Sequence, residues 1–140
     1  MRTFVHYSIG LLLISILGCG AGDQRFNAKG RITLDGKPFQ TKEKEKMRIF
    51  FQPLSESATE SYAGEYNGEE GTFTVVGKDL KGIPPGKYRV SIQLINNGND
   101  LFHNKLAGAK SPFTCEVVDA KSEVTIDLDP VKDVIESAQR

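Results

Sequence analysis

The segment Lys87-Tyr88-Arg89-Val90-Ser91-Ile92-Gln93-Leu94 decides the fold class of this chain. Its polar and apolar residues alternate, and successive side chains of a strand point to opposite faces, so the apolar residues share one face. The pattern predicts a half-buried strand of an antiparallel sheet, with Ser91 among the residues that face water. A rigid bend, Gly82-Ile83-Pro84-Pro85-Gly86, precedes this strand, because each proline fixes its own φ and restricts its predecessor.

Further strand patterns lie on both sides of this segment. Residues 28–34 alternate up to Asp35-Gly36, a dipeptide typical of tight hairpin turns. Residues 47–52 are rich in aromatic and β-branched residues and stop at Pro53, which predicts a strand with Met47, Ile49 and Phe51 turned inward. Weaker patterns predict an edge strand at 60–66 with a hairpin partner at 72–76, and a last hairpin formed by 113–118 and 123–128.

These patterns predict an all-β domain over residues 28–130. About seven short strands separated by turn signals, without a long helical period, favour an antiparallel two-sheet sandwich of the prealbumin-like or Ig-like kind. Residues 131–140 have helical propensity, and we expect a short C-terminal helix or tail there.

The N-terminus has the organisation of an export signal. Arg2 supplies a positive charge, and an apolar stretch follows from Phe4 to Gly18. A transmembrane anchor is the alternative, but spanning a bilayer requires about 20 apolar residues, and this stretch is shorter and interrupted by His6, Ser8 and Ser15. We therefore expect residues 1–18 to be a signal peptide.

The run Ile16-Leu17-Gly18-Cys19 resembles the lipobox of bacterial lipoproteins. The resemblance implies cleavage before Cys19, acylation of that cysteine, and a membrane partner reached through the lipid, with residues 19–27 as the lipidated cysteine and a tether. Gly20, rather than an aspartate, follows Cys19, which implies the outer membrane in preference to the inner one. Two or three acyl chains suffice for stable anchoring.

The domain itself resembles the carboxypeptidase regulatory-like, or transthyretin-like, family. The resemblance is carried by residues 30–38, 49–53, 71–75 and 82–90, in that order and spacing. It implies a prealbumin-like sandwich. Such motifs specify a fold and say little about chemistry. The lipobox, the β pattern and the lack of a catalytic motif together predict a non-catalytic module of the cell envelope that binds a protein or a glycan.

Two segments supply candidate binding residues. Tyr62, Tyr66 and Phe102 fall in expected loops or edge segments, where aromatics could form a recognition patch for sugar rings or peptide, but ordinary packing is the favoured interpretation. Asn97, Asn99 and Asp100 offer oxygen ligands for Ca²⁺, but the segment lacks the run of acids of an EF-hand, which favours a plain turn.

Other classes of function receive little support from the sequence. Lys and Arg balance Asp and Glu at 18 each, so no basic footprint for nucleic acid is visible. His103 has no motif that places a nucleophile beside it, Cys115 sits in an apolar strand, and neither a metal nor another cofactor is expected. Two alternatives remain open: a purely structural envelope protein, and an enzyme like the transthyretin-related hydrolases, whose terminal Tyr-Arg-Gly-Ser motif is replaced here by residues 137–140.

Overall fold

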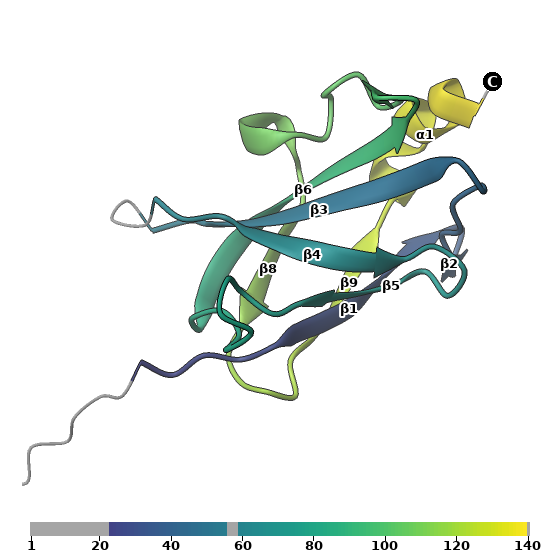
Figure 1. Ribbon diagram of the computed structural model, residues 1–140. Coiled ribbons are helices and arrows are strands. Elements are labelled where there is room, and N and C mark those ends of the chain that lie inside the picture. The colour runs from purple at the N-terminus through teal and green to yellow at the C-terminus, as the bar shows by residue number, and fades with distance from the viewer. Residues whose placement is uncertain (1–22, 56–58, 140) are drawn as a thin grey trace, which may run out of the picture.

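The computed structural model describes residues 23–55 and 59–139, which form a β-rich domain with one short α-helix near the C-terminus (Figure 1). No helix in these two ranges has the length and apolar character needed to cross a membrane. The elements are β1 (Ala28–Leu34), β2 (Lys37–Pro38), β3 (Glu45–Pro53), β4 (Tyr62–Asn67), β5 (Thr72–Val75), β6 (Gly86–Asn96), β7 (Asn99–Asp100), η1 (Gly108–Lys110), β8 (Thr114–Val117), β9 (Glu123–Asp127), η2 (Asp129–Val131) and α1 (Lys132–Gln139).

The strands form one curled sheet. Hydrogen bonding runs without interruption in the order β8-β6-β3-β4-β5-β1-β9, while the two-residue strands β2 and β7 extend β1 and β6. All neighbouring pairs are antiparallel except β1 and β9, which are parallel. The predicted β-rich class is confirmed, and its sheet is continuous and contains one parallel pair.

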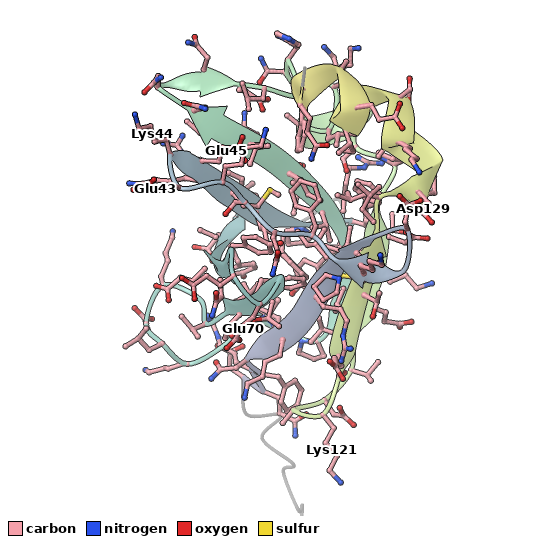
Figure 2. All side chains as sticks on the ribbon, turned by 90° about the vertical axis from the view of Figure 1, so that its right-hand side faces the viewer. Glu43, Lys44, Glu45, Glu70, Lys121 and Asp129 are labelled. Carbon is pink, nitrogen blue, oxygen red and sulfur yellow. The ribbon has the colours of Figure 1, made fainter. Side chains whose placement is uncertain are left out.

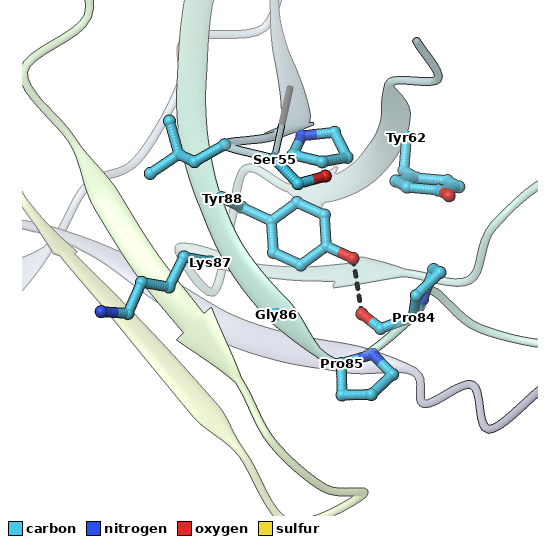
Figure 3. Close-up of a pocket in the computed structure, with 9 residues that line it drawn as sticks. Ser55, Tyr62, Pro84, Pro85, Gly86, Lys87 and Tyr88 are labelled. Atoms are coloured by element: carbon cyan, nitrogen blue, oxygen red, sulfur yellow. Dashed lines mark hydrogen bonds between the residues drawn. The ribbon is translucent and has the colours of Figure 1, made fainter. Parts of the chain in front are cut away.

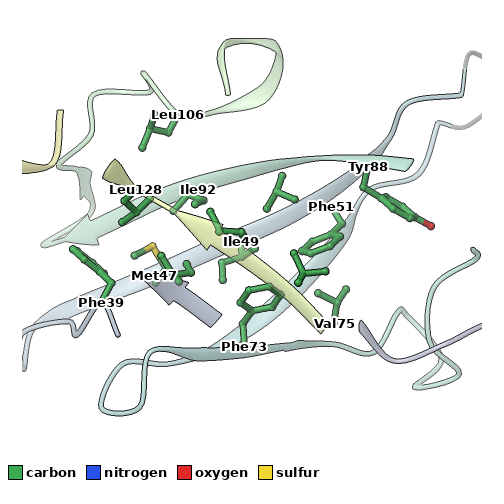
Figure 4. Packing of buried hydrophobic residues seen from close by; sticks show 14 of the residues in the cluster. Phe39, Met47, Ile49, Phe51, Phe73, Val75, Tyr88, Ile92, Leu106 and Leu128 are labelled. Atoms are coloured by element: carbon green, nitrogen blue, oxygen red, sulfur yellow. The ribbon is translucent and has the colours of Figure 1, made fainter. Parts of the chain in front are cut away.

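The core lies inside the curl and follows the predicted alternation. Tyr88, Val90, Ile92 and Leu94 are buried along β6, and the partner strand β3 buries the predicted set of Met47, Ile49 and Phe51 (Figure 4). Ser91 was predicted to face water but is only 6% exposed. The segment after β7 folds over the outer face of β6 and covers it, and the Gly108 N–H donates to Ser91 Oγ over 2.8 Å.

The Asp35-Gly36 turn is confirmed. It joins β1 to β2 with φ angles of 52° and 70°, the left-handed values that a tight hairpin of this kind requires at both central positions. Asp129 Oδ1 accepts from the Asp35 N–H at 2.7 Å, and Lys132 Nζ lies 2.6 Å from Asp35 Oδ1. The turn is thereby tied to the C-terminal segment, where α1 buries Val134 and Ile135 against the core.

The predicted pairing of residues 60–66 with 72–76 is confirmed as β4 and β5, but one predicted placement and one other predicted pairing are wrong. β4 was expected at an edge because of its polar residues, but it lies between β3 and β5. Its polarity arises because the outer face of the curled sheet meets solvent even in central strands. β8 and β9 were expected to form a hairpin; instead β8 pairs with β6 and β9 with β1, so that each completes a ladder at an opposite border of the sheet.

The described chain begins at one end of the domain, which we call the basal end. Its backbone is fastened there by a pair of bonds: the Phe26 N–H donates to the Ile83 oxygen over 2.9 Å, and the Ile83 N–H donates to the Phe26 oxygen over 2.8 Å. The turn between β6 and β7 lies at the opposite end, near α1 (Figure 1). The basal end is formed by residues 23–27, 53–55, 76–86 and 118–122.

Candidate functional site

An apolar hollow of about 360 Å³ opens at the basal end (Figure 3). Three chain segments meet around it: the end of β3 with the residues that follow, the first residue of β4, and the proline bend with the start of β6. The lining residues are Pro53, Leu54, Ser55, Tyr62, Pro84, Pro85, Gly86, Lys87 and Tyr88.

Tyr88 forms the floor of the hollow and fixes the proline bend. It is the first inward-facing side chain of β6, and its hydroxyl donates to the Pro84 carbonyl over 2.5 Å (Figure 3). Burial raises the pKa of Tyr88 to about 12, so the hydroxyl keeps its proton at neutral pH. Because the hydroxyl proton is already bonded to the Pro84 carbonyl, Tyr88 offers a ligand mainly the apolar surface of its ring.

Tyr62 stands edge-on to Tyr88, with ring centroids 6.2 Å apart and an interplanar angle of 71°. This arrangement is favourable for aromatic pairs. The Tyr62 hydroxyl donates to Glu60 Oε2 over 3.4 Å, and Lys78 Nζ lies 3.3 Å from the other oxygen of that carboxylate. Burial, together with the charge of Glu60, raises the pKa of Tyr62.

Leu54 and Lys87 form a shared rim between this hollow and a neighbouring one. Leu54 is 42% exposed and adds apolar area to the rim. The neighbouring hollow, of about 310 Å³, is lined by Leu54, Lys87, Thr114, Cys115 and Glu116. The two hollows form a shallow, mostly apolar surface that crosses from the β3 end to β8.

Cys115 packs against the core at the edge of this surface, which agrees with the expectation of a structural cysteine. Burial raises the pKa of its thiol to about 12, from an ordinary value of 9.0. We expect the thiol of the folded Cys19→Ala variant to react with iodoacetamide at pH 8 roughly a thousandfold more slowly than in urea, because the thiolate is the reactive form. Folded and unfolded rates within about tenfold of each other would contradict the burial of this thiol.

The candidate aromatic residues have separate roles. Tyr62 lines the hollow, whereas Tyr66 donates its hydroxyl to the Phe39 carbonyl and lies partly buried against the core. Phe102 is fully buried, with 0% exposure. Tyr66 and Phe102 thus follow the favoured interpretation of ordinary packing and form no exposed aromatic patch with Tyr62; Phe102 is buried because the residues after β7 turn inward over β6.

Asp100 organises the segment after β7. One carboxylate oxygen accepts from the Leu94 and Phe102 N–H groups, each over 3.1 Å, and the other accepts from the Asn104 N–H over 2.9 Å. Asn97 and Asn99 are exposed around the β6–β7 turn. With both Asp100 oxygens facing backbone donors, the geometry fits the plain-turn alternative and not a Ca²⁺ site.

Replacing Asp100 with alanine should lower the free energy of unfolding by about 1–3 kcal/mol, because three backbone N–H groups lose their acceptor. The neighbouring Asn99→Ala substitution is the control and should stay within about 0.5 kcal/mol of the unmodified protein. Urea unfolding followed by circular dichroism measures both. Equal effects of the two substitutions would show that the carboxylate does not hold this segment.

The described residues offer no further chemistry-bearing cluster. They contain no group of three or more His, Cys, Asp or Glu side chains that could hold a metal ion. His103 is exposed in a turn with a φ of 51°. The residues predicted to direct lipidation, Ile16, Leu17, Gly18 and Cys19, lie outside the described ranges.

The fold and the hollow define a β-rich domain with an apolar surface at its basal end. No protein-family model matches the sequence, and no curated protein matches it at a significant level. Among solved structures, a DUF3823 family protein from Parabacteroides merdae ATCC 43184 is similar, with 14% sequence identity and a TM-score of 0.44. The match covers 74% of this chain and 45% of that one, so the chain spans less than half of that protein.

Sequence reasoning did not predict the hollow. The segment Pro84-Pro85-Gly86 was interpreted only as a bend, and Leu54 was given no role. Two prolines beside a tyrosine-led strand, with an aliphatic residue after Pro53, were the available signal. Their convergence depends on β3 pairing with β6, where Pro53 lies opposite Tyr88.

Proposed function

We propose that this protein is a lipid-anchored component of a bacterial cell envelope whose β-domain binds another protein without catalysing a reaction. The proposal combines the lipobox-like run ending at Cys19 with the apolar hollow at the basal end. In this proposal the domain is a prealbumin-like sandwich. Its two layers are the two sides of one continuous sheet, which face each other across the core because the sheet is curled. The outer membrane is the preferred location, because Gly20 follows the lipidated cysteine.

The observation that carries the binding role is the chemistry of the hollow. Proline rings, two tyrosine rings and Leu54 supply apolar contact, while the Tyr88 hydroxyl is already bonded to Pro84. A glycan would need several unengaged polar groups for its hydroxyls, whereas an apolar side chain of a protein segment needs mainly a preformed apolar surface. A protein partner therefore fits better than a glycan.

In-cell photocrosslinking tests this role. A photoreactive phenylalanine at Ser55, which lines the hollow, should give a discrete crosslinked product, and the same group at the exposed Thr125 of β9 should not. Adding Leu54→Glu should abolish the product, because a carboxylate at the rim opposes burial of an apolar side chain. Asn99→Glu adds the same charge at the exposed β6–β7 turn, away from the hollow, and should leave the product intact. No product from Ser55, or one that survives Leu54→Glu, would refute this binding site.

A further inference from the structure

Large apolar side chains that are exposed in the described ranges gather at the basal end. They are Leu54, at 42%, Leu80, at 76%, and Val118, at 60%. Each comes from a different connection: Leu54 follows β3, Leu80 lies between β5 and β6, and Val118 follows β8. Scattered apolar residues are ordinary on a protein surface, but three from separate connections at one end indicate a surface that something covers.

The short segment between Cys19 and the domain limits how far a lipid on Cys19 can lie from the basal end. Phe26 is fastened to Ile83, and the seven peptide units between Cys19 and Phe26 reach at most about 25 Å. The opposite end is farther away, because the 11 residues of β6 alone extend about 36 Å. A lipid on Cys19 therefore holds the basal end closer to the bilayer than the far end.

We propose that the basal end rests on the phospholipid surface, with Leu80 and Val118 entering the boundary between headgroups and acyl chains. This inference rests on the lipid anchor of the proposed function and adds an orientation to it. Apolar side chains at the end of an already anchored domain bind an interface by the same burial that holds amphipathic segments there. Leu54 belongs to the same end, so the hollow opens beside the bilayer and its partner approaches along the membrane.

Charges around these side chains do not favour one kind of lipid. Lys78, Asp79 and Lys81 flank Leu80, and Lys78 is paired with Glu60. Val118 is followed by Asp119 and, two positions after that, by Lys121. Because both signs are present, contact should form on neutral phosphatidylcholine and should depend little on salt.

Tryptophan fluorescence tests the orientation directly, since the chain contains no tryptophan of its own. Four single variants report on three places: Leu80→Trp and Val118→Trp at the basal end, Thr125→Trp on the flank and Lys44→Trp near the opposite end. Figure 2 shows Lys44 far from Lys121, which marks the basal end. Each acylated protein is reconstituted in phosphatidylcholine vesicles with and without bromine on the acyl chains. We expect at least twofold stronger quenching for the two basal positions.

The outcomes separate this inference from the anchor. Intact mass of each sample shows whether acyl chains are present, and their absence would overturn the anchor and the orientation together. Acylated protein with equal quenching at all four positions, or stronger quenching at Thr125 or Lys44, would overturn the orientation alone. Leu80 has a φ of 57°, so Val118→Trp decides the test if a bulkier ring disturbs that turn.

Discussion

Replacing Gly30 with alanine should destabilise the domain more than the same substitution at Gly64 or Gly86, the other glycines within the strands. Gly30 lies in β1 opposite Phe73 of β5 and Val124 of β9. A Cβ there would lie 2.0 Å from the Val124 carbonyl oxygen and 2.6 Å from Phe73 Cζ. The first contact is with backbone, so β9 must move away from β1. We expect a loss of about 3 kcal/mol or more in the free energy of unfolding.

Gly98→Ala is the matched control for this prediction. Gly98 has a φ of 83° and nothing within 4 Å of its Cβ position, so its substitution adds backbone strain without a clash. That strain costs about 1–2 kcal/mol. Urea unfolding of both variants gives the comparison. A Gly30→Ala variant as stable as Gly98→Ala would contradict the close approach of β1 and β9.

Truncating Phe51 to alanine is the second large effect. Phe51 is fully buried on β3, and its ring centroid lies 5.8 Å from those of both Phe73 and Tyr88. These contacts join β3 to β5 and β6 across the interior of the curl. Removing the ring leaves a cavity at this junction, and we expect a loss of about 3–5 kcal/mol.

The adjacent Phe50 provides the control, because it is the same residue type on the opposite face of the same strand. It is only partly buried, so Phe50→Ala should cost about 1 kcal/mol from its smaller burial. Both variants can be compared in one set of urea titrations. Similar losses for Phe50 and Phe51 would mean that the inward face of β3 has been assigned wrongly.

The strands and their inward faces were predictable because they depend on local alternation. Tyr88, Val90, Ile92 and Leu94 repeat every second residue, and that period alone places them on one buried face. The Asp35-Gly36 turn was predictable for a similar reason, since two residues determine its backbone conformation.

Pairings between distant strands were not predictable in the same way. Residues 113–118 and 123–128 are close in sequence, which suggested a hairpin. In the structure they add to different edges of the sheet, where β8 pairs with β6 and β9 pairs with β1. Phe102 was placed in an expected loop or edge segment; it is buried in the segment that three backbone bonds to Asp100 hold over β6. The hollow likewise requires Pro53 to lie opposite Tyr88, a contact between residues far apart in the chain.

The central claim, that the chain is a lipoprotein, is tested most directly by the intact mass of the protein extracted from membranes beside a Cys19→Ala variant. We predict a chain that starts at Cys19 and carries acyl chains, with both the cleavage and the added mass lost in the variant. An unacylated chain that still starts at Met1 would contradict the claim and favour the alternative that residues 1–18 remain as an uncleaved anchor.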